Sequence, residues 1–317
     1  MSLSPKLIRQ FLIWLVVGIA AYGIAVAYAD IDKIQESLTK LGWSGWSAVL
    51  ALSSVNILLR FGRWQFYLNA LGYHVQARRS AQYFVASFAF ISTPAKAGEV
   101  LRSLYLKNRE GVNYPDSLGA LFVERLTDLI TVVLLALVAA YTFGEYRWLV
   151  ALAGCLTLSM LPLIHSQFLR SLLIRLGDKI ANPRIQTAVK HLVELITSSA
   201  SLLRSAPLYG GLALSIIAGL MVCPIMYVVL TLLDAQISLA LAIGIYATGI
   251  LVGALSFLPG GIGSAELVMI GLLVLAGVDP GTATAATLIC RLATLWYSIG
   301  LGIIVMVRLE FMSGESK

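Results

Sequence analysis

The sequence predicts an all-α integral membrane protein with six transmembrane helices plus two re-entrant helical hairpins arranged as an inverted repeat. Three observations predict this class. Hydrophobic residues make up 59% of the 317 residues and charged residues only 12%, and the mean hydropathy is +0.86. Soluble domains are roughly 45–50% apolar and about 25% charged. Long runs without charge recur along the chain, and two apolar stretches are interrupted by proline and glycine, which end helices.

The net charge of +7 and the pI near 9.4 would suggest a nucleic-acid partner in a soluble protein. Here the basic residues cluster in loops between apolar runs, which is the pattern of the positive-inside rule and of contact with anionic lipid headgroups. The chain has no basic module with interleaved aromatic residues, so we expect no nucleic-acid binding. Cys155, Cys223 and Cys290 lie in apolar segments without CxxC spacing, which predicts buried side chains and neither a metal site nor a cofactor.

The first repeat is predicted to cover residues 1–142 and to begin with the span Phe11–Ala29. Lys6 and Arg9 precede this span, so the positive-inside rule places the N-terminus in the cytoplasm. Asp30–Trp46 carries mixed charges and is expected to be an outer amphipathic segment.

The second span is predicted from about Trp46 to Leu71. It contains Arg60 and Arg63, which are three residues apart and therefore share a helical face. Two interpretations stay open for these arginines. They either snorkel toward the cytoplasmic headgroups or grip a lipid phosphate.

The first re-entrant hairpin is predicted around Pro94. The apolar arm Ala81–Ile91 is too short to cross a bilayer, which takes about 20 residues. It ends at a break that contains Pro94, Gly98 and Glu99, and a basic stretch follows up to Arg109. A short arm, a break and a basic return indicate a hairpin that enters and leaves on the cytoplasmic side.

The third span, about Ser117–Tyr141, carries Glu124, Arg125 and Asp128 in its first half. Their spacing of three and four residues lets all three share one flank of a helix. Charges this deep in a membrane are costly unless they face the protein interior, pair with one another or meet a polar ligand. A purely structural ion pair and a ligand site both stay open.

The second repeat is predicted to cover residues 143–317 and to reach the outer side with its hairpin. The apolar run Ile237–Val278 carries one charge, Glu266, and is too long for a single crossing. Pro259 and the two glycines after it break the helix, and a new helix is expected to start at Gly263-Ser264. The other predicted elements are the span Trp148–Ile164, the basic cytoplasmic amphipathic segment 165–206, the span Leu208–Leu233 with a kink at Pro224, and the span Thr282–Val307 with Arg291.

An internal match supports the inverted repeat. Pro94 and Pro259 both stand four residues before a glycine, and Arg125 and Arg291 both precede a leucine. These pairs, and Gly111-Val112 with Gly277-Val278, recur at an offset of 165 or 166 residues. Since the first half starts inside and the second starts outside, the two halves would be inverted.

Inverted repeats with broken helices place a site near the membrane midplane, where half-helix N-termini present free amides. Such amides favour an anion such as phosphate. Arg125 and Arg291 would supply matched cations, and Glu99 and Glu266 would pair with them or carry a proton. The predicted substrate-binding residues are Arg63, Lys96, Gly98, Glu99, Arg102, Arg125, Asp128, Gly261, Gly263, Ser264, Glu266 and Arg291.

At these residues the chain resembles the flippase-like transmembrane domain of the lysylphosphatidylglycerol synthase family, also called the UPF0104 family. The resemblance covers residues 7–308 and is carried by Arg63-Trp64, by Pro94 with Gly98-Glu99 and Arg102, by Glu124-Arg125-Leu126 with Asp128, and by Pro259-Gly260-Gly261-Ile262-Gly263 with Glu266. It implies a membrane domain that moves lipids between leaflets. An aminoacyl-transferase domain follows in the best-known members. We find none before Lys317, so we expect no lipid synthesis here and leave the cargo open.

We therefore expect a membrane lipid translocase, and no enzyme, because no nucleophile with a base, phosphate loop or nucleotide fold is visible. The expected location is the cytoplasmic (inner) membrane with both termini cytoplasmic, and the expected partner is a membrane lipid with an anionic or phosphate-bearing headgroup. Two alternatives stay open: a proton-coupled secondary transporter of a small solute, and a non-transporting accessory subunit of a membrane enzyme. A homo-oligomer and a separate lipid-modifying enzyme also stay open as protein partners.

Overall fold

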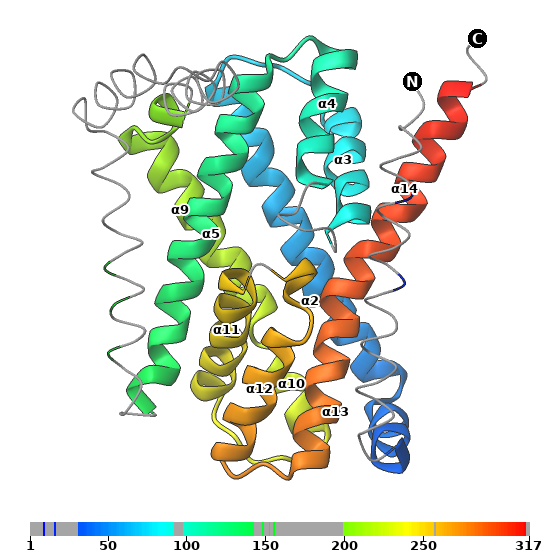
Figure 1. Ribbon diagram of the computed structural model, residues 1–317, viewed down its shortest axis with the longest axis vertical. Coiled ribbons are helices and arrows are strands. Elements are labelled where there is room, and N and C mark those ends of the chain that lie inside the picture. The colour runs from blue at the N-terminus through cyan, green and yellow to red at the C-terminus, as the bar shows by residue number, and fades with distance from the viewer. Residues whose placement is uncertain are drawn as a thin grey trace, which may run out of the picture.

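The structure, a computed structural model, describes residues 31–91, 98–142, 199–256 and 258–314, together with the single residues 9, 16, 148, 152 and 155. Every regular element in these ranges is a helix (Figure 1). Three helical stretches within them are long and apolar enough to cross a membrane: Gln35–Ala70, Ala206–Leu232 and Pro280–Leu309. The predicted spans Phe11–Ala29 and Trp148–Ile164 lie outside the described residues apart from single positions, and the basic segment 165–206 is described only from residue 199 on.

Helix α2, Ile31–Ala70, runs the height of the molecule. It has one break at Gly42, whose φ of 58° is open to glycine at little cost. The kink divides a first segment from the long helix that follows, as predicted, but it lies at Gly42, a few residues before the expected boundary at Trp46. Beyond the end of α2, Tyr73 donates a hydrogen bond of 2.6 Å to Asp116. Burial of the hydroxyl, and next this bond, raise the pKa of Tyr73.

The first short helical pair follows α2. Helix α3 (Ala77–Ala86) continues into the 3₁₀ turn η1 (Ser87–Phe90), and α4 (Gly98–Glu110) returns beside it. Helix α5 (Tyr114–Thr142) then runs the full height of the molecule (Figure 1). A short arm, a return and a long helix follow one another in the predicted order, and α5 covers the predicted third span, Ser117–Tyr141. Its helical structure is confirmed, whereas its crossing of the membrane stays a prediction.

The second half of the described chain repeats this order. Helices α9 (Ser205–Val222) and α10 (Ile225–Leu232) are divided at Pro224, as predicted. Helix α11 (Leu239–Leu255) leads to the 3₁₀ turn η4 (Pro259–Gly261), and α12 (Ser264–Leu275) returns. Helix α13 (Pro280–Arg291), the π-helical turn η5 (Leu292–Trp296) and α14 (Tyr297–Gly314) form the last long helix.

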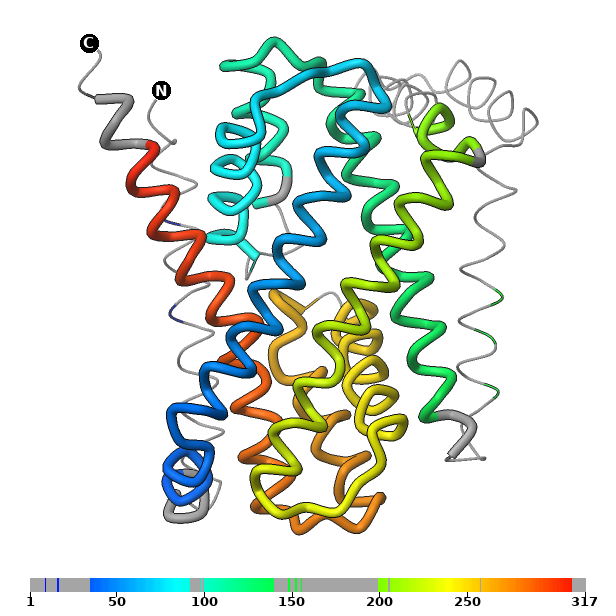
Figure 2. Tube along the Cα trace, turned by 180° about the vertical axis from the view of Figure 1, so that it is seen from behind, coloured from blue at the N-terminus to red at the C-terminus, as the bar shows by residue number. Residues whose placement is uncertain are grey.

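The two short pairs occupy opposite halves of the molecule. Both views place α3 with α4 in the upper half and α11 with α12 in the lower half (Figures 1 and 2). Each pair packs on the last long helix of the other half, and α2 packs along α9. A Cβ on Gly302 of α14 would lie 2.3 Å from the amide nitrogen of Ala89, and one on Gly244 of α11 would lie 2.4 Å from that of Ala139 on α5. Glycine therefore permits both backbone contacts.

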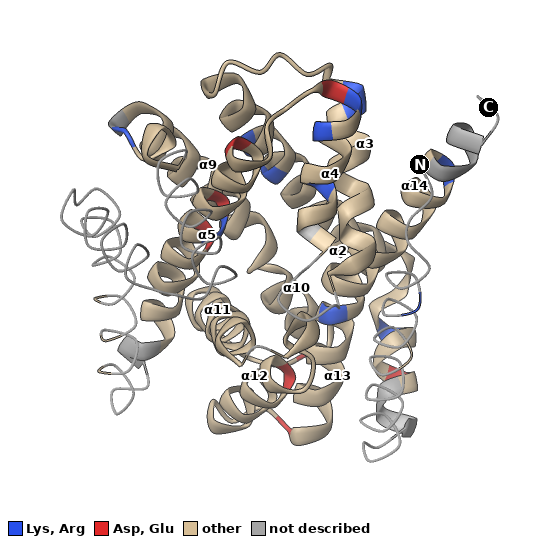
Figure 3. Cartoon of the chain, turned by 45° about the horizontal axis from the view of Figure 1, so that its top comes forward, with Lys and Arg blue, Asp and Glu red and all other residues tan. Residues whose placement is uncertain are grey.

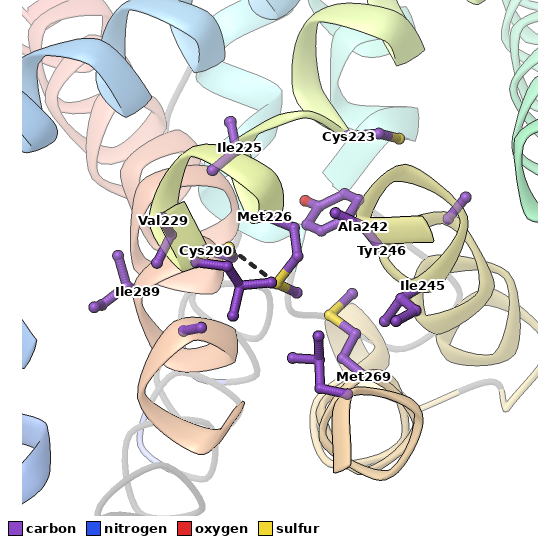
Figure 4. Close-up of a cluster of buried hydrophobic side chains, with 14 of the residues drawn as sticks. Cys223, Ile225, Met226, Val229, Ala242, Ile245, Tyr246, Met269, Ile289 and Cys290 are labelled. Atoms are coloured by element: carbon purple, nitrogen blue, oxygen red, sulfur yellow. Dashed lines mark hydrogen bonds between the residues drawn. The ribbon is translucent and has the colours of Figure 1, made fainter. Parts of the chain in front are cut away.

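Two hydrophobic clusters form the core. One gathers side chains of α3, η1, α4 and the upper parts of α2 and α5, and the other gathers side chains of α10 to α13. Figure 4 shows part of the second cluster, in which the Cys290 thiol lies 3.7 Å from the Met226 sulfur. Cys223 and Cys290 are buried as predicted, whereas Cys155 is exposed. An apolar side chain on a membrane protein can face lipid, so its hydrophobicity does not require burial inside the protein.

Candidate functional site

A buried arginine of α2 is the centre of the first charged group. Arg63 has no exposed surface, so the prediction that it snorkels toward the headgroups is wrong for this residue. Its Nη1 donates to Asp128 Oδ1 at 2.6 Å and to the Ser215 hydroxyl on α9, and its Nη2 lies 3.4 Å from Glu124 Oε1. One guanidinium thus joins α2 to α5 and α9.

Arg102 reaches the same group from α4. It is 2% exposed, and its Nη2 donates to Glu124 Oε2. Its guanidinium carbon lies 3.5 Å from the centre of the Trp64 ring and 5.0 Å from that of Phe84. Stacking on an aromatic face and a bond to a carboxylate are the two contacts for which a planar guanidinium is best suited.

Two half-buried arginines complete the group. Arg60 Nη2 lies 3.2 Å from Asp128 Oδ2, and Arg125 Nη1 lies 3.3 Å from the same oxygen. We call Arg60, Arg63, Arg102, Glu124, Arg125 and Asp128 the upper cluster. Figure 3 shows that charged residues are few along the helices and that both signs occur together on α5.

The upper cluster has more positive than negative groups. Among the side chains that the structure describes, four arginines face two carboxylates, so the upper cluster as described carries an excess of two positive charges. Three of its neighbouring N–H donors on α2 have no hydrogen-bond partner among the described residues: Arg60 Nε, Arg63 Nε and Trp64 Nε1. Buried donors are normally satisfied. Excess charge and unsatisfied donors together favour an additional anionic acceptor.

The second charged group lies in the lower half, where α12 starts. Glu266 is buried, and its Oε1 accepts from Arg291 Nε at 2.5 Å. Its Oε2 accepts from the Gly263 amide at 2.7 Å, and Arg291 Nη2 donates to the Gly260 carbonyl at 2.7 Å. We call Glu266 and Arg291 the lower pair. The predicted helix start at Gly263-Ser264 is confirmed, and its first turn holds Glu266.

The structure brings most of the predicted residues to these two places. Arg63, Arg102, Arg125 and Asp128 lie in the upper cluster, and Glu266 and Arg291 form the lower pair. Three other predicted residues shape the hairpin backbones. Gly98 abuts Phe90, Gly261 abuts the Gly253 backbone, and the Ser264 hydroxyl donates to the Gly261 carbonyl at 3.2 Å.

Two predicted residues cannot be placed in a site. Lys96 lies outside the described residues, and Glu99 lies in α4 but its side chain is not described. Within the described ranges, no three histidine, cysteine or acidic side chains gather closely enough to hold a metal ion.

The predicted substrate-binding residues did not include Glu124, Trp64, Ser215 or Gly260. The sequence did group Glu124 with Arg125 and Asp128 on one helical flank, which is the signal that locates it in the upper cluster. Ser215 sits in an uncharged helix with many small residues, and no pattern in the sequence distinguishes it.

The two halves use the same kind of ion pair with the charges exchanged. In the upper half, Arg102 on the returning arm α4 bonds Glu124 on the following helix α5. In the lower half, Glu266 on the returning arm α12 bonds Arg291 on the following helix α13. The sequence matches Arg125 with Arg291, yet Arg125 bonds Asp128 within its own helix. In both halves an ion pair joins the returning arm to the following helix, but the residues that form it do not occupy matching positions in the sequence.

Comparison with known proteins agrees with this membrane architecture. The chain matches the family described as "Lysylphosphatidylglycerol synthase TM region" over residues 13–302. It is similar to two proteins of Methanothermobacter thermautotrophicus that are each named "UPF0104 membrane protein". One is 29% identical over 68% of this chain and 68% of that protein, and the other is 21% identical over 92% and 93%.

A third relative is larger. The chain is 27% identical to "Glycosyltransferase AglD" of Haloferax volcanii over 43% of this chain, and this stretch spans only 22% of that protein. Because the family match covers most of the sequence, the chain belongs to the lysylphosphatidylglycerol synthase transmembrane region family.

Proposed function

We propose that this protein is a flippase-like membrane lipid translocase, which moves a phospholipid or a lipid-linked headgroup between leaflets. The observation that carries the proposal is the upper cluster, where the described side chains, buried or half-buried, include two more positive than negative charges. A membrane protein retains such charges for function more often than for stability, since each is costly to bury. A phosphate-bearing headgroup would supply the missing negative charge and the acceptors for the unsatisfied donors of α2.

The packing of the helices supports alternating access between two inverted halves. In this proposal residues 1–142 and 143–317 are the two repeats, with six spans and two re-entrant hairpins in all. Each short pair contacts the last long helix of the other half, which is the reciprocal packing that a twofold relation would produce. Because the upper cluster and the lower pair lie in different halves, a headgroup could be passed from one to the other.

A liposome assay tests the proposal. The full chain would be reconstituted with a fluorescent phosphatidylglycerol, and dithionite added outside would report how fast inner-leaflet label becomes accessible. We expect the protein to accelerate this exchange. The double variant Arg60→Gln with Arg125→Gln should slow it by roughly a hundredfold or more, because each of the two lost charge-assisted hydrogen bonds is worth about 1.5–3 kcal/mol. Both side chains are partly exposed, so the fold should survive.

The matched control is Arg78→Gln, which removes an exposed arginine outside the cluster. Exchange no faster than in protein-free liposomes would refute lipid translocation by this chain. Equal rates for wild type and the double variant would leave translocation standing but remove the upper cluster as the headgroup site. A labelled neutral glycolipid that crosses as fast as phosphatidylglycerol would contradict the requirement for phosphate.

A further inference from the structure

In the lower pair, the Glu266 carboxylate is held by the kinds of donor that bind an anionic ligand. The two oxygens of Glu266 take one guanidinium N–H and one backbone amide at the start of α12. A phosphate oxygen bound to protein meets the same donors, namely an arginine and the free amide at a helix N-terminus. The carboxylate thus occupies a place that suits an external oxyanion.

A second observation points to a ligand at this place. Thr287 lies four residues before Arg291 on α13, so the two share a helical face. Its side chain is fully buried, and its hydroxyl has no hydrogen-bond partner among the described residues. A threonine in a helix usually bonds a backbone carbonyl when nothing else is offered. This hydroxyl, one helical turn from Arg291, is a further donor that an anion larger than a carboxylate could use.

The upper cluster and the lower pair differ in net charge, counted over the described side chains. The upper cluster has two positive charges in excess, whereas one carboxylate neutralises one arginine in the lower pair. The lower half also satisfies Arg291 with the Gly260 carbonyl. In the conformation described, the upper half can therefore accept an anion and the lower half is already filled.

We infer that Glu266 is an internal stand-in for the lipid phosphate, and that a phosphate reaching the lower half must displace it from Arg291 and the Gly263 amide. The inference rests on the proposed function, since it assigns the second station of the same lipid. Glu266 is then a gating residue, which keeps the lower half closed until an anion with more acceptor oxygens arrives. Only one phospholipid phosphate should bind tightly to the wild-type chain.

Counting bound lipids tests this inference. The full chain in detergent micelles would be titrated with a short-chain, water-soluble phosphatidylglycerol, and native mass spectrometry would count the bound molecules. We expect one equivalent for wild type and two for Glu266→Gln, because a neutral amide holds the guanidinium weakly. Adding Arg291→Met to Glu266→Gln should return the count to one. The matched control Glu36→Gln removes an exposed acid elsewhere and should bind one.

A second variant keeps the test decisive if Glu266→Gln does not fold. Glu266→Asp retains the charge beside Arg291, but the shorter side chain cannot hold both the guanidinium and the Gly263 amide. It should bind the second equivalent with intermediate affinity. A single equivalent for every folded Glu266 variant would overturn the inference, and so would a second equivalent that survives the loss of Arg291.

Other outcomes distinguish the inference from the function it rests on. Wild type that binds none, with a Glu266→Gln variant that binds one through Arg291, would support the stand-in and remove the upper cluster as a lipid site. A parallel titration with inorganic phosphate compares the free ion with the headgroup. Binding of inorganic phosphate without binding of the lipid would overturn the assignment to a lipid.

Discussion

At the scale of single residues, the buried charges in the described part of the chain lie in groups and each has a partner of opposite sign. Arg63 is fully enclosed, yet Asp128, Glu124 and Ser215 accept from it. Taking a charge out of water costs several kcal/mol, and this cost is offset only when partners are close and well oriented. The arrangement explains why polar residues persist on helices whose remaining side chains are apolar.

The contribution of Arg102 to stability is expected to require an arginine and not only a positive charge. In Arg102→Lys the ammonium would keep the charge near Glu124 but lose the planar stack on Trp64, which lies 3.5 Å away. We expect a loss of stability of about 2 kcal/mol, the usual worth of a desolvated cation–π contact. Thermal unfolding in detergent would measure it. Arg109→Lys is the control, because Arg109 is exposed above Tyr105 and should change stability by less than about 0.5 kcal/mol.

Glu124 is expected to be the most sensitive acid of the upper cluster. It accepts from both Arg63 and Arg102, so Glu124→Gln raises the excess of positive charge and leaves two buried guanidinium groups with one partner fewer. Removing one member of a buried ion pair costs about 3–5 kcal/mol. Chemical denaturation would detect this loss, and Asp234→Asn, at an exposed pair with Lys40, should be nearly neutral. Equal stability for both variants would contradict the buried pairing.

At the scale of elements, each returning arm is tied by an ion pair to the helix that follows it. The entering arm of each pair, α3 with η1 or α11, packs on the last long helix of the other half. Contact between backbones requires glycine, since any side chain would hold the helices apart. The turns η1 and η4 both contain buried residues and pack against neighbouring helices, where their backbone groups can find partners within the protein.

Gly302 offers a direct test of this packing. An alanine Cβ there would lie 2.3 Å from the Ala89 nitrogen, so η1 and α14 must separate. Gly302→Ala should lose about 1–3 kcal/mol of stability by overpacking. Gly300→Ala, two residues earlier on α14, meets nothing within 4 Å and should be neutral or slightly stabilising through its helix propensity. The thermal midpoints of the two variants would be compared, and a Gly302 variant as stable as the Gly300 variant would refute the close contact.

At the scale of the whole molecule, exposed charge is distributed unevenly between the two ends. Arg78, Arg79, Lys107 and Arg109 are exposed near the start of α3 and the end of α4. The opposite end carries the Lys40–Asp234 pair and the Asp279 cap of α13. The positive-inside rule therefore predicts that the arginine-rich end faces the cytoplasm.

Labelling of cysteines would test this orientation. In a background with Cys155→Ser, since Cys155 is the exposed thiol, single cysteines would replace Arg78 and Asp234. An impermeant maleimide added to intact cells should label position 234 and not position 78, and both should react after the membrane is opened. Labelling at 78 alone would reverse the predicted topology.

The sequence by itself determined the membrane class, the break at Pro259, the helix start at Gly263 and the presence of arginines within apolar stretches. These features follow from local physics, because apolar length, proline and glycine act through the few residues around them. Only the tertiary structure decided that Arg102 donates to Glu124, that Arg63 donates to the Ser215 hydroxyl, and that Arg125 forms an ion pair with Asp128. Helical periodicity fixes which face a charge occupies, but its partner depends on which helix packs there and at what depth.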